Sequence, residues 1–235
     1  MTALANDIRE LANRTMAALD ASHDYYTFTK RMWRLLQKVV AEGRTFSFRN
    51  RATGSKVSEQ TLMGRAELYV ADYLRSSTFQ DFVSRFEDFF FQLLRLWLAA
   101  YPASLSRKNV EMATVLKAPG KDAIVLTVID KELNELKYER VADWFAYLER
   151  LVKLGCPTAV EIEKLAEIKA SRDVLVHNNG VANSVYVLKA GNIARFRDGD
   201  ELEVPEGYHR ASWEIIKKVV GDVASAAITK AQAQS

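Results

Sequence analysis

Three ionisable side chains lie close together in the stretch SRDVLVHNNG, residues 171–180. Arg172, Asp173 and His177 are an anion-binding cation, a carboxylate and a histidine, and together they can bind and cleave a phosphodiester. In RNA, a histidine can take the proton of the 2′-hydroxyl or give one to the leaving oxygen. An arginine can stabilise the charge that develops on the phosphoryl group, so this route needs no metal ion.

The residues around Arg172 place it on the apolar face of a helix. Four residues follow one helical stripe with a 3-4-3 spacing: Leu165, Ile168, Arg172 and Leu175. A guanidinium keeps its charge, so it needs an acid partner, a subunit interface or a cleft that anions enter. Glu87 lies at the edge of an earlier apolar helix face. It is a candidate partner, and the alternative is a position at the rim in water.

Asp173 and His177 are four residues apart, so they share one face of the helix and the carboxylate can orient the imidazole. The run Asn178-Asn179-Gly180 predicts the end of the helix directly after the histidine, where the helix dipole favours cations. Arg172 and His177 are about 140° apart around the helix. They can reach one phosphate over the helix end, or across a two-fold axis between two such helices.

A second candidate RNA-binding segment spans residues 44–56, RTFSFRNRATGSK, where two phenylalanines alternate with polar residues and no acid occurs. One interpretation is a loop that contacts RNA phosphates and bases. The other, which the pattern favours, is a solvated β-hairpin or linker whose Phe46 and Phe48 pack on neighbouring helices. The residues assigned to RNA binding are Arg44, Arg49, Arg51, Lys56 and, beside the histidine, Asn178.

Composition and periodicity predict an all-α fold. The 235 residues are 49% hydrophobic with only 4 Pro and 10 Gly, which is typical of long helices around a sizeable core. Two amphipathic stretches near the N-terminus predict a helical hairpin or arm, and we expect a break at Ser77 or Thr78. The expected helices are 4–11, 25–39, 58–76, 79–101, 122–137, 139–154, 158–178 and 208–230, with a short helix or strand near 186–188.

The remaining sequence features exclude several classes of protein. The single cysteine, Cys156, cannot form an intrachain disulfide, which suits a cytoplasmic protein, and it lacks an activating motif. No metal-binding or nucleotide-cofactor motif is present, and the histidines are far apart, so we expect no cofactor and no metal. The N-terminus is no signal peptide, and the most apolar stretch is too short and too charged to span a membrane. The net charge of +3 does not by itself establish a nucleic-acid partner.

The run RDVLVHNNGVANSVY at the end of a helix resembles the signature of HEPN domains (higher eukaryotes and prokaryotes nucleotide-binding), R-x4-6-H. The upstream VSRFEDFFFQLL and YERVADWFAYLERL also resemble helices of that family, and the resemblance covers residues 79–228. It implies a helical bundle that dimerises through the motif helices and acts as a metal-independent ribonuclease of toxin or defence systems. Arg172, Asp173 and His177 then match the motif, and Glu87 is the helix acid that holds the arginine.

Two positions depart from the family pattern. The polar residue after the arginine is commonly Asn and is Asp173 here, which puts a negative charge beside the phosphate site. In toxins of the family with R-x4-6-H-x-Y, a nucleotidyltransferase antitoxin modifies the tyrosine, and Asn179 takes that place here.

The sequence thus predicts an N-terminal helical arm with a basic loop at 1–56 and a HEPN-like helical bundle at 57–235. The predicted function is an endoribonuclease that leaves a 2′,3′-cyclic phosphate, with RNA, a second copy and an antitoxin or defence-system protein as partners. The alternative is a non-catalytic interaction module in which Arg172 pairs with Glu87 and His177 caps the helix. A weaker alternative is an RNA or nucleotide binder that uses residues 44–56.

Overall fold

The computed structural model describes residues 2–44, 48–105 and 108–234, and these residues are predominantly helical, as the sequence predicts. In chain order the elements are α1 (Ala3–Ala41), β1 (Phe48–Arg49), β2 (Lys56–Val57), α2 (Glu59–Leu68), the π-helical turn η1 (Tyr69–Tyr73), α3 (Leu74–Ala100), the 3-10 turn η2 (Pro102–Leu105), α4 (Met112–Lys117), α5 (Lys121–Lys137), α6 (Val141–Val152), α7 (Ala159–His177), α8 (Ser184–Ala190), the 3-10 turn η3 (Gly191–Ile193) and α9 (Glu206–Ala233).

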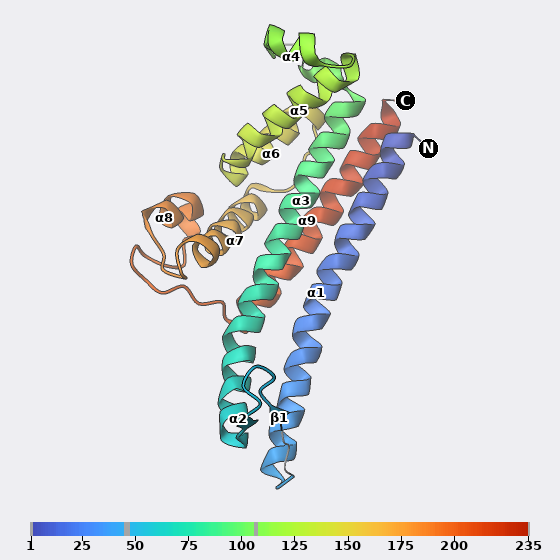
Figure 1. The fold of residues 1–235 in the computed structure, drawn as a ribbon. Helices are drawn as coiled ribbons and strands as arrows, with labels where there is room; N and C mark the ends of the chain where they lie inside the picture. The colour runs from blue at the N-terminus through green and yellow to red at the C-terminus, as the bar shows by residue number, and fades with distance from the viewer. Residues whose placement is uncertain (1, 45–47, 106–107, 235) are drawn as a thin grey trace.

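Three long helices, α1, α3 and α9, lie side by side and form the body of the molecule (Figure 1). The two chain ends meet at one end of this body, and the small hairpin and α2 lie at the other. Helix α3 is buried on more than one side, because it packs against α1 and α9 and also against α5 and α7. Its fully buried side chains are mainly aromatic: Phe79, Phe82, Phe86, Phe89, Phe90 and Trp97.

Helix α1 is one continuous helix, so of the two predicted N-terminal arrangements, a helical hairpin or an arm, the hairpin is wrong. Residues 12–24 contain neither glycine nor proline, and nothing in that stretch interrupts helical hydrogen bonding. Ser22 and Asp24, candidate caps in the sequence, lie inside the helix, and Thr2 is the cap that accepts the Ala5 amide at 3.2 Å. Apolar residues of the N-terminal half of α1 belong to the same hydrophobic core as residues of α3 and α9. The predicted domain boundary at residue 56 stays a prediction.

The expected break at Ser77 and Thr78 is also wrong, because helical structure runs without a gap from α2 through η1 into α3. Both hydroxyls donate to the Leu74 carbonyl, Ser77 at 3.1 Å and Thr78 at 2.7 Å. Such bonds to a preceding turn let serine and threonine remain within a helix. The predicted end of α3 is confirmed, since the helix ends at Ala100, just before Pro102.

Helices α5, α6, α7 and α8 lie along one side of the long body (Figure 1). Helix α6 contacts α7, and α7 contacts α3, α8 and α9. The predicted capping box at the start of α7 is confirmed: the Thr158 hydroxyl accepts from the Glu161 amide at 3.4 Å, and the Glu161 carboxylate accepts from the Thr158 amide at 2.8 Å. The helix that carries the motif therefore has both of its predicted ends.

None of the helices in the described ranges is both long and apolar enough to cross a membrane.

His209 of α9 is fully buried where α1, α3 and α9 meet. Its ring lies 4.3 Å from the Tyr26 ring and 4.8 Å from the Phe82 ring, measured between centroids. The Thr78 hydroxyl lies 2.8 Å from Nε2 and already donates to Leu74, so its oxygen accepts the Nε2 hydrogen. Nδ1 is buried without a hydrogen-bond partner. Burial, with the nearby His23 and Arg75, lowers the pKa of His209 to about 4.

We expect His209 to make the fold less stable in mild acid. Below its unfolded pKa of about 6.5, the unfolded chain binds a proton that the folded chain excludes. The stability contributed by neutral His209 is therefore complete above pH 6.5 and is lost as pH falls toward about 4. The free energy of unfolding in urea should fall by up to about 3 kcal/mol over this range. His209→Gln keeps the donor to Thr78 without titrating, and an equal pH dependence in both proteins would contradict this assignment.

Candidate functional site

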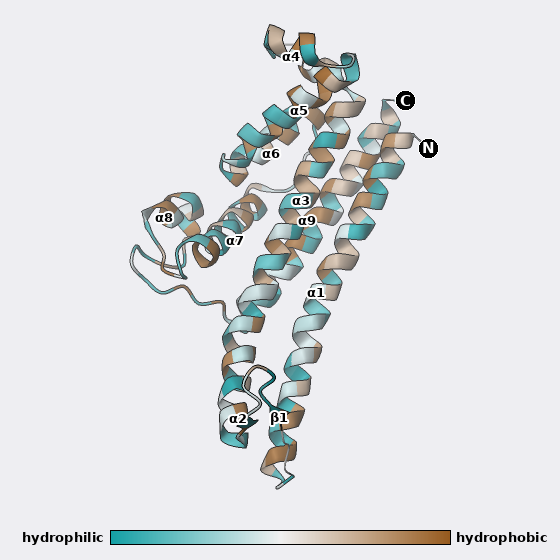
Figure 2. Cartoon of the chain, viewed as in Figure 1, coloured by the Kyte–Doolittle hydropathy of each residue, from teal (hydrophilic) through white to brown (hydrophobic). Residues whose placement is uncertain are grey.

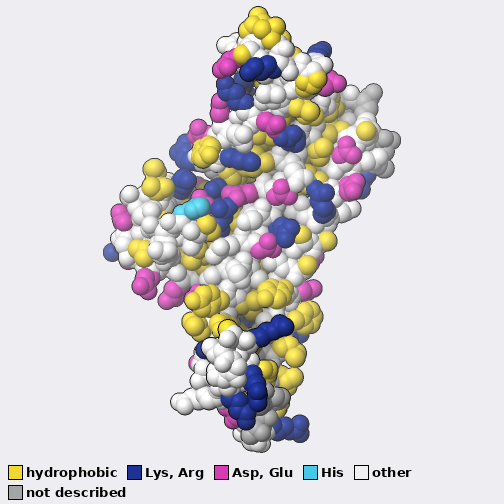
Figure 3. All heavy atoms as spheres, in the orientation of Figure 1, with side chains coloured by type: hydrophobic (Ala, Val, Ile, Leu, Met, Phe, Trp, Pro, Cys, Tyr) yellow, Lys and Arg dark blue, Asp and Glu magenta, His cyan; other side chains and the backbone are white. Residues whose placement is uncertain are grey.

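A pocket of about 480 Å³ lies where α3, the end of α5, α6, α7 and α8 come together. The four side chains that the sequence predicts as catalytic, Glu87, Arg172, Asp173 and His177, all line it. The other lining residues are three lysines, three aromatic residues and one further acid: Lys137, Lys169, Lys189, Phe91, Tyr138, Trp144 and Asp88. Figure 3 shows a histidine among basic and acidic side chains on this side of the molecule.

Arg172 is held between two carboxylates. Its Nη2 atom contacts Glu87 Oε2, which confirms Glu87 as the partner that the sequence suggests, and its Nη1 lies 3.1 Å from Asp173 Oδ1. The Arg172 side chain is 14% exposed and that of Glu87 22%, so the pair lies at the edge of the core and is partly desolvated. Arg172 Nε is buried and has no hydrogen-bond partner, so the guanidinium keeps one unused donor.

Asp173 is surrounded by cations, and this overturns its predicted role of orienting His177. Lys169 Nζ lies 2.8 Å from its carboxylate and Lys189 Nζ 3.9 Å, in addition to the contact with Arg172. Within the described ranges, no hydrogen bond or ion pair joins Asp173 to His177. The physical reason is competition, since three positive charges attract the carboxylate more strongly than an imidazole four residues away.

His177 occupies the last position of α7 and its side chain is exposed. The Asn178 amide donates to the Val174 carbonyl at 2.9 Å, and Asn179 and Gly180 then take left-handed conformations with φ of 50° and 78°. These two residues end the helix as the sequence predicts, because asparagine and glycine adopt that conformation most readily. The imidazole therefore lies at the negative end of the helix, open to solvent.

Arg172 and His177 line one pocket of a single chain. Of the two arrangements that the spacing leaves open, a phosphate over the end of one helix thus matches this geometry without a second copy. A neighbouring cavity of about 220 Å³ is lined by His177, Asn178 and residues of α8. The Asn178 side-chain amide donates to the Val181 carbonyl, and its assignment to RNA binding stays a prediction.

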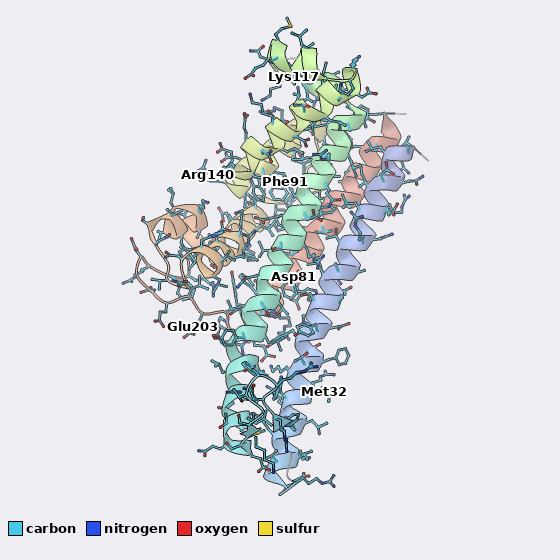
Figure 4. All side chains as sticks on the ribbon, viewed as in Figure 1. Met32, Asp81, Phe91, Lys117, Arg140 and Glu203 are labelled. Atoms are coloured by element: carbon cyan, nitrogen blue, oxygen red, sulfur yellow. The ribbon has the colours of Figure 1, made fainter. Side chains whose placement is uncertain are left out.

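The sequence did not identify the lysines and aromatic rings of this pocket. Lys169 lies 5.5 Å from the Trp144 ring centroid and 3.3 Å from Glu87, so it links α6, α7 and α3. Its position four residues before Asp173 is a signal that sequence could have used. Lys137 lies 5.3 Å from the centroid of Phe91, labelled in Figure 4, but no spacing connects it or α8 with the motif.

The predicted RNA-binding segment lies far from this pocket, at the end of the molecule formed by α2 and the last turns of α1 (Figure 1). The predicted β-hairpin is confirmed, with Phe48 opposite Val57 and Arg49 opposite Lys56. Its four cations, Arg44, Arg49, Arg51 and Lys56, are exposed, and Phe48 is 46% exposed. Phe46 lies outside the described residues. The structure therefore does not join the two candidate RNA-binding regions into one site.

Two other kinds of site receive no support. Cys156 is half-buried, and burial raises the pKa of its thiol, which disfavours the reactive thiolate. Among residues 2–44, 48–105 and 108–234, no group of three or more histidine, cysteine, aspartate or glutamate residues is placed to hold a metal ion.

No family model, no curated protein and no solved structure matches this chain. The resemblance to HEPN domains therefore depends on the motif residues themselves. The proposed function therefore depends on the side chains that line the pocket.

Proposed function

We propose that the protein is a HEPN-like, metal-independent endoribonuclease whose active site is the pocket between α3, α6, α7 and α8. One observation carries this proposal: the arginine and histidine of the motif line the same pocket together with three lysines. Four cations face three carboxylates there, which favours an anionic ligand. The exposed imidazole supplies a proton-transfer group within the same space.

The proposed reaction is an internal transfer at the phosphodiester. His177 exchanges a proton with the reacting oxygens, and Arg172 with Lys169 stabilises the charge on the phosphoryl oxygens. The 2′-hydroxyl gives its proton to His177 or to water as the O2′–P bond forms. The P–O5′ bond then breaks, and O5′ takes up a proton from His177 or from water. The products are a 2′,3′-cyclic phosphate and a 5′-hydroxyl, and no further reactant is consumed.

The partners that the resemblance implies belong to the same proposal. They are RNA as the substrate, a second copy bound through α7, and an antitoxin or another protein of a defence system. Pairing of α7 with its copy near the C-terminal end of the helix would set two His177 side chains near one another. The set of residues named for the reaction is present in one chain, so activity of the monomer is compatible with the proposal.

Incubation of the full chain with single-stranded RNA of mixed sequence, in the presence of a metal chelator, tests the proposed activity. We expect internal cleavage, and mass spectrometry of the fragments should find 2′,3′-cyclic phosphate ends. Cleavage that requires an added divalent metal, or fragments with 5′-phosphate ends, would contradict the mechanism. A lack of cleavage across such a mixed pool would contradict the function itself.

A second candidate is a non-catalytic interaction module, and the pairing of Arg172 favours it. Its two terminal nitrogens already contact Glu87 and Asp173, which is the arrangement expected of a structural ion pair. In that case the protein does not cleave RNA, and Arg172→Ala lowers the stability of the fold because two partly buried carboxylates, Glu87 and Asp173, then share Lys169 and Lys189 as their remaining cations. The chelator experiment separates the two candidates.

A further inference from the structure

The outward face of the second half of α1 carries a row of large apolar side chains. The row, here called the α1 seam, consists of Tyr25, Phe28, Met32, Leu35 and Val39. The first four are 60%, 58%, 64% and 54% exposed. Exposed apolar patches of this size on a folded protein usually mark a surface that binds something. In Figure 3, hydrophobic side chains gather on the surface around the lower half of the long helices, and Figure 4 labels Met32 there.

The seam does not belong to the core of this chain. Tyr26 and Lys30, on the same turns, are the buried residues of this half of α1. At 100° per residue, the seam is centred roughly opposite these two positions around the helix. Helix α1 thus packs inward with one face and presents a second apolar face outward. Figure 2 shows the hydrophobic residues of this lower part of α1 as brown turns beside hydrophilic, teal ones.

The spacing of the seam indicates that its partner is another helix. The intervals between its residues are 3, 4, 3 and 4, which is the a/d pattern of a two-stranded coiled coil. Such a strict a/d row is narrower than the apolar face of a helix that lies in a membrane surface or a protein core. The four most exposed side chains present roughly 500 Å². A symmetric pair that covers these side chains completely therefore removes about 1,000 Å² from water, which is the lower limit for a specific interface.

We propose that the α1 seam binds the α1 seam of a second copy in antiparallel orientation. Asp24 and Lys38 flank the seam near its two ends, on the same side. Antiparallel pairing sets each carboxylate beside the ammonium group of the other copy, whereas parallel pairing sets identical residues at the same height. Arg31, between them, meets its own copy near the axis, and its exposed side chain can turn into solvent. Because α1 is already held by α3 and α9, pairing requires little new ordering.

The oligomeric state of the full chain tests this proposal. Sedimentation velocity across low and high micromolar concentrations should show a dimer. Met32→Glu places two carboxylates at the buried centre and should raise the dimer dissociation constant about a hundredfold or more. Leu116→Glu, at another exposed leucine, should leave it unchanged. Val176→Glu, beside His177 on α7, disturbs the α7 pairing of the proposed function, so a dimer that is lost in this variant and kept in Met32→Glu would assign the interface to α7 and contradict the seam. Thermal unfolding of each variant shows whether the fold is intact.

Three outcomes would overturn the proposal. The first is a wild-type monomer throughout the concentration range, and the second is a dimer that survives Met32→Glu. The third is a monomer that binds anionic lipid vesicles through Met32, which would make a membrane the occupant of the seam. Orientation is tested in a Cys156→Ser background with Tyr25→Cys and Leu35→Cys chains. Mixing them should give more disulfide dimer than either alone, and equal cross-linking of Tyr25→Cys by itself would contradict antiparallel pairing.

Discussion

His177→Ala should lower the rate of RNA cleavage by about a hundredfold to ten-thousandfold, the usual contribution of a positioned general acid or base. The reason is that, among the residues lining the pocket, His177 has the only imidazole, while Glu87 and Asp173 are engaged by cations. Its side chain is exposed and packs little, so the variant should unfold at the same urea concentration as the wild type. The loss should therefore appear in the rate of cleavage and not in the amount of folded protein.

The matched control is Val176→Ala, which changes an exposed residue on the same turn and should keep the wild-type rate. RNA binding, measured by fluorescence anisotropy, should change little in His177→Ala because Arg172 and the lysines remain. Cleavage by His177→Ala at the wild-type rate would show that His177 takes no part in the reaction. The pocket would then be a binding site at most. An equal loss in both variants would point to a disturbed helix end instead of lost chemistry.

Helix periodicity predicts much of this fold because the buried residues follow it closely. The apolar stripes of α3, α6 and α9 are read directly from the sequence, and the capping box at Thr158 fixes the start of α7. The wrong predictions are two helix breaks, one within α1 and one at Ser77 or Thr78, where the structure has continuous helix. Serine and threonine signal caps, yet Ser22, Ser77 and Thr78 all lie inside helices. The hydroxyls of Ser77 and Thr78 donate to the Leu74 carbonyl of the preceding turn, and Thr78 is buried by the neighbouring helices. Local sequence does not contain that tertiary context.

The candidate site is predictable only as far as one helix determines it. The places of Arg172 and His177 on α7, and the contact of Arg172 with Glu87, follow from a charged residue on an apolar stripe. The contacts of Asp173 cannot be predicted from the sequence of α7 alone, because Lys189 belongs to α8 and the position of α8 depends on the whole bundle. The four-residue spacing predicted His177 as the partner of Asp173, whereas the structure shows that Asp173 contacts cations instead.

Glu167 is the buried charge with the most contacts near the motif, and it stabilises the segment that carries α8. Its side chain is 4% exposed. Oε1 accepts from Ser171, Tyr186 and Arg195 at 2.8, 3.0 and 2.9 Å, and Oε2 accepts from Tyr208 at 2.7 Å. The guanidinium of Arg195 also lies 3.4 Å from the Tyr208 ring centroid. One carboxylate thus joins α7, α8, the connection after η3 and the start of α9.

We expect Glu167→Gln to lower the free energy of unfolding by about 3–5 kcal/mol, the range for removing one member of a buried ion pair. The amide keeps the shape of the side chain but leaves the guanidinium of Arg195 without a countercharge, and its NH₂ group faces hydroxyl donors. Urea unfolding followed by circular dichroism measures the change. Glu163→Gln, an exposed acid on the same helix, is the control and should alter stability by less than about 0.5 kcal/mol.

A double substitution distinguishes a lost ion pair from a general disturbance of packing. Glu167→Leu alone leaves a partly buried arginine without its acid, whereas Glu167→Leu combined with Arg195→Met removes both charges. The double variant should therefore be more stable than Glu167→Leu, although each change alone is destabilising. Simple addition of the two losses would show that the charges act independently, which contradicts the direct contact between Glu167 and Arg195. A stable Glu167→Gln protein would likewise mean that packing of α8, and not this carboxylate, holds the segment in place.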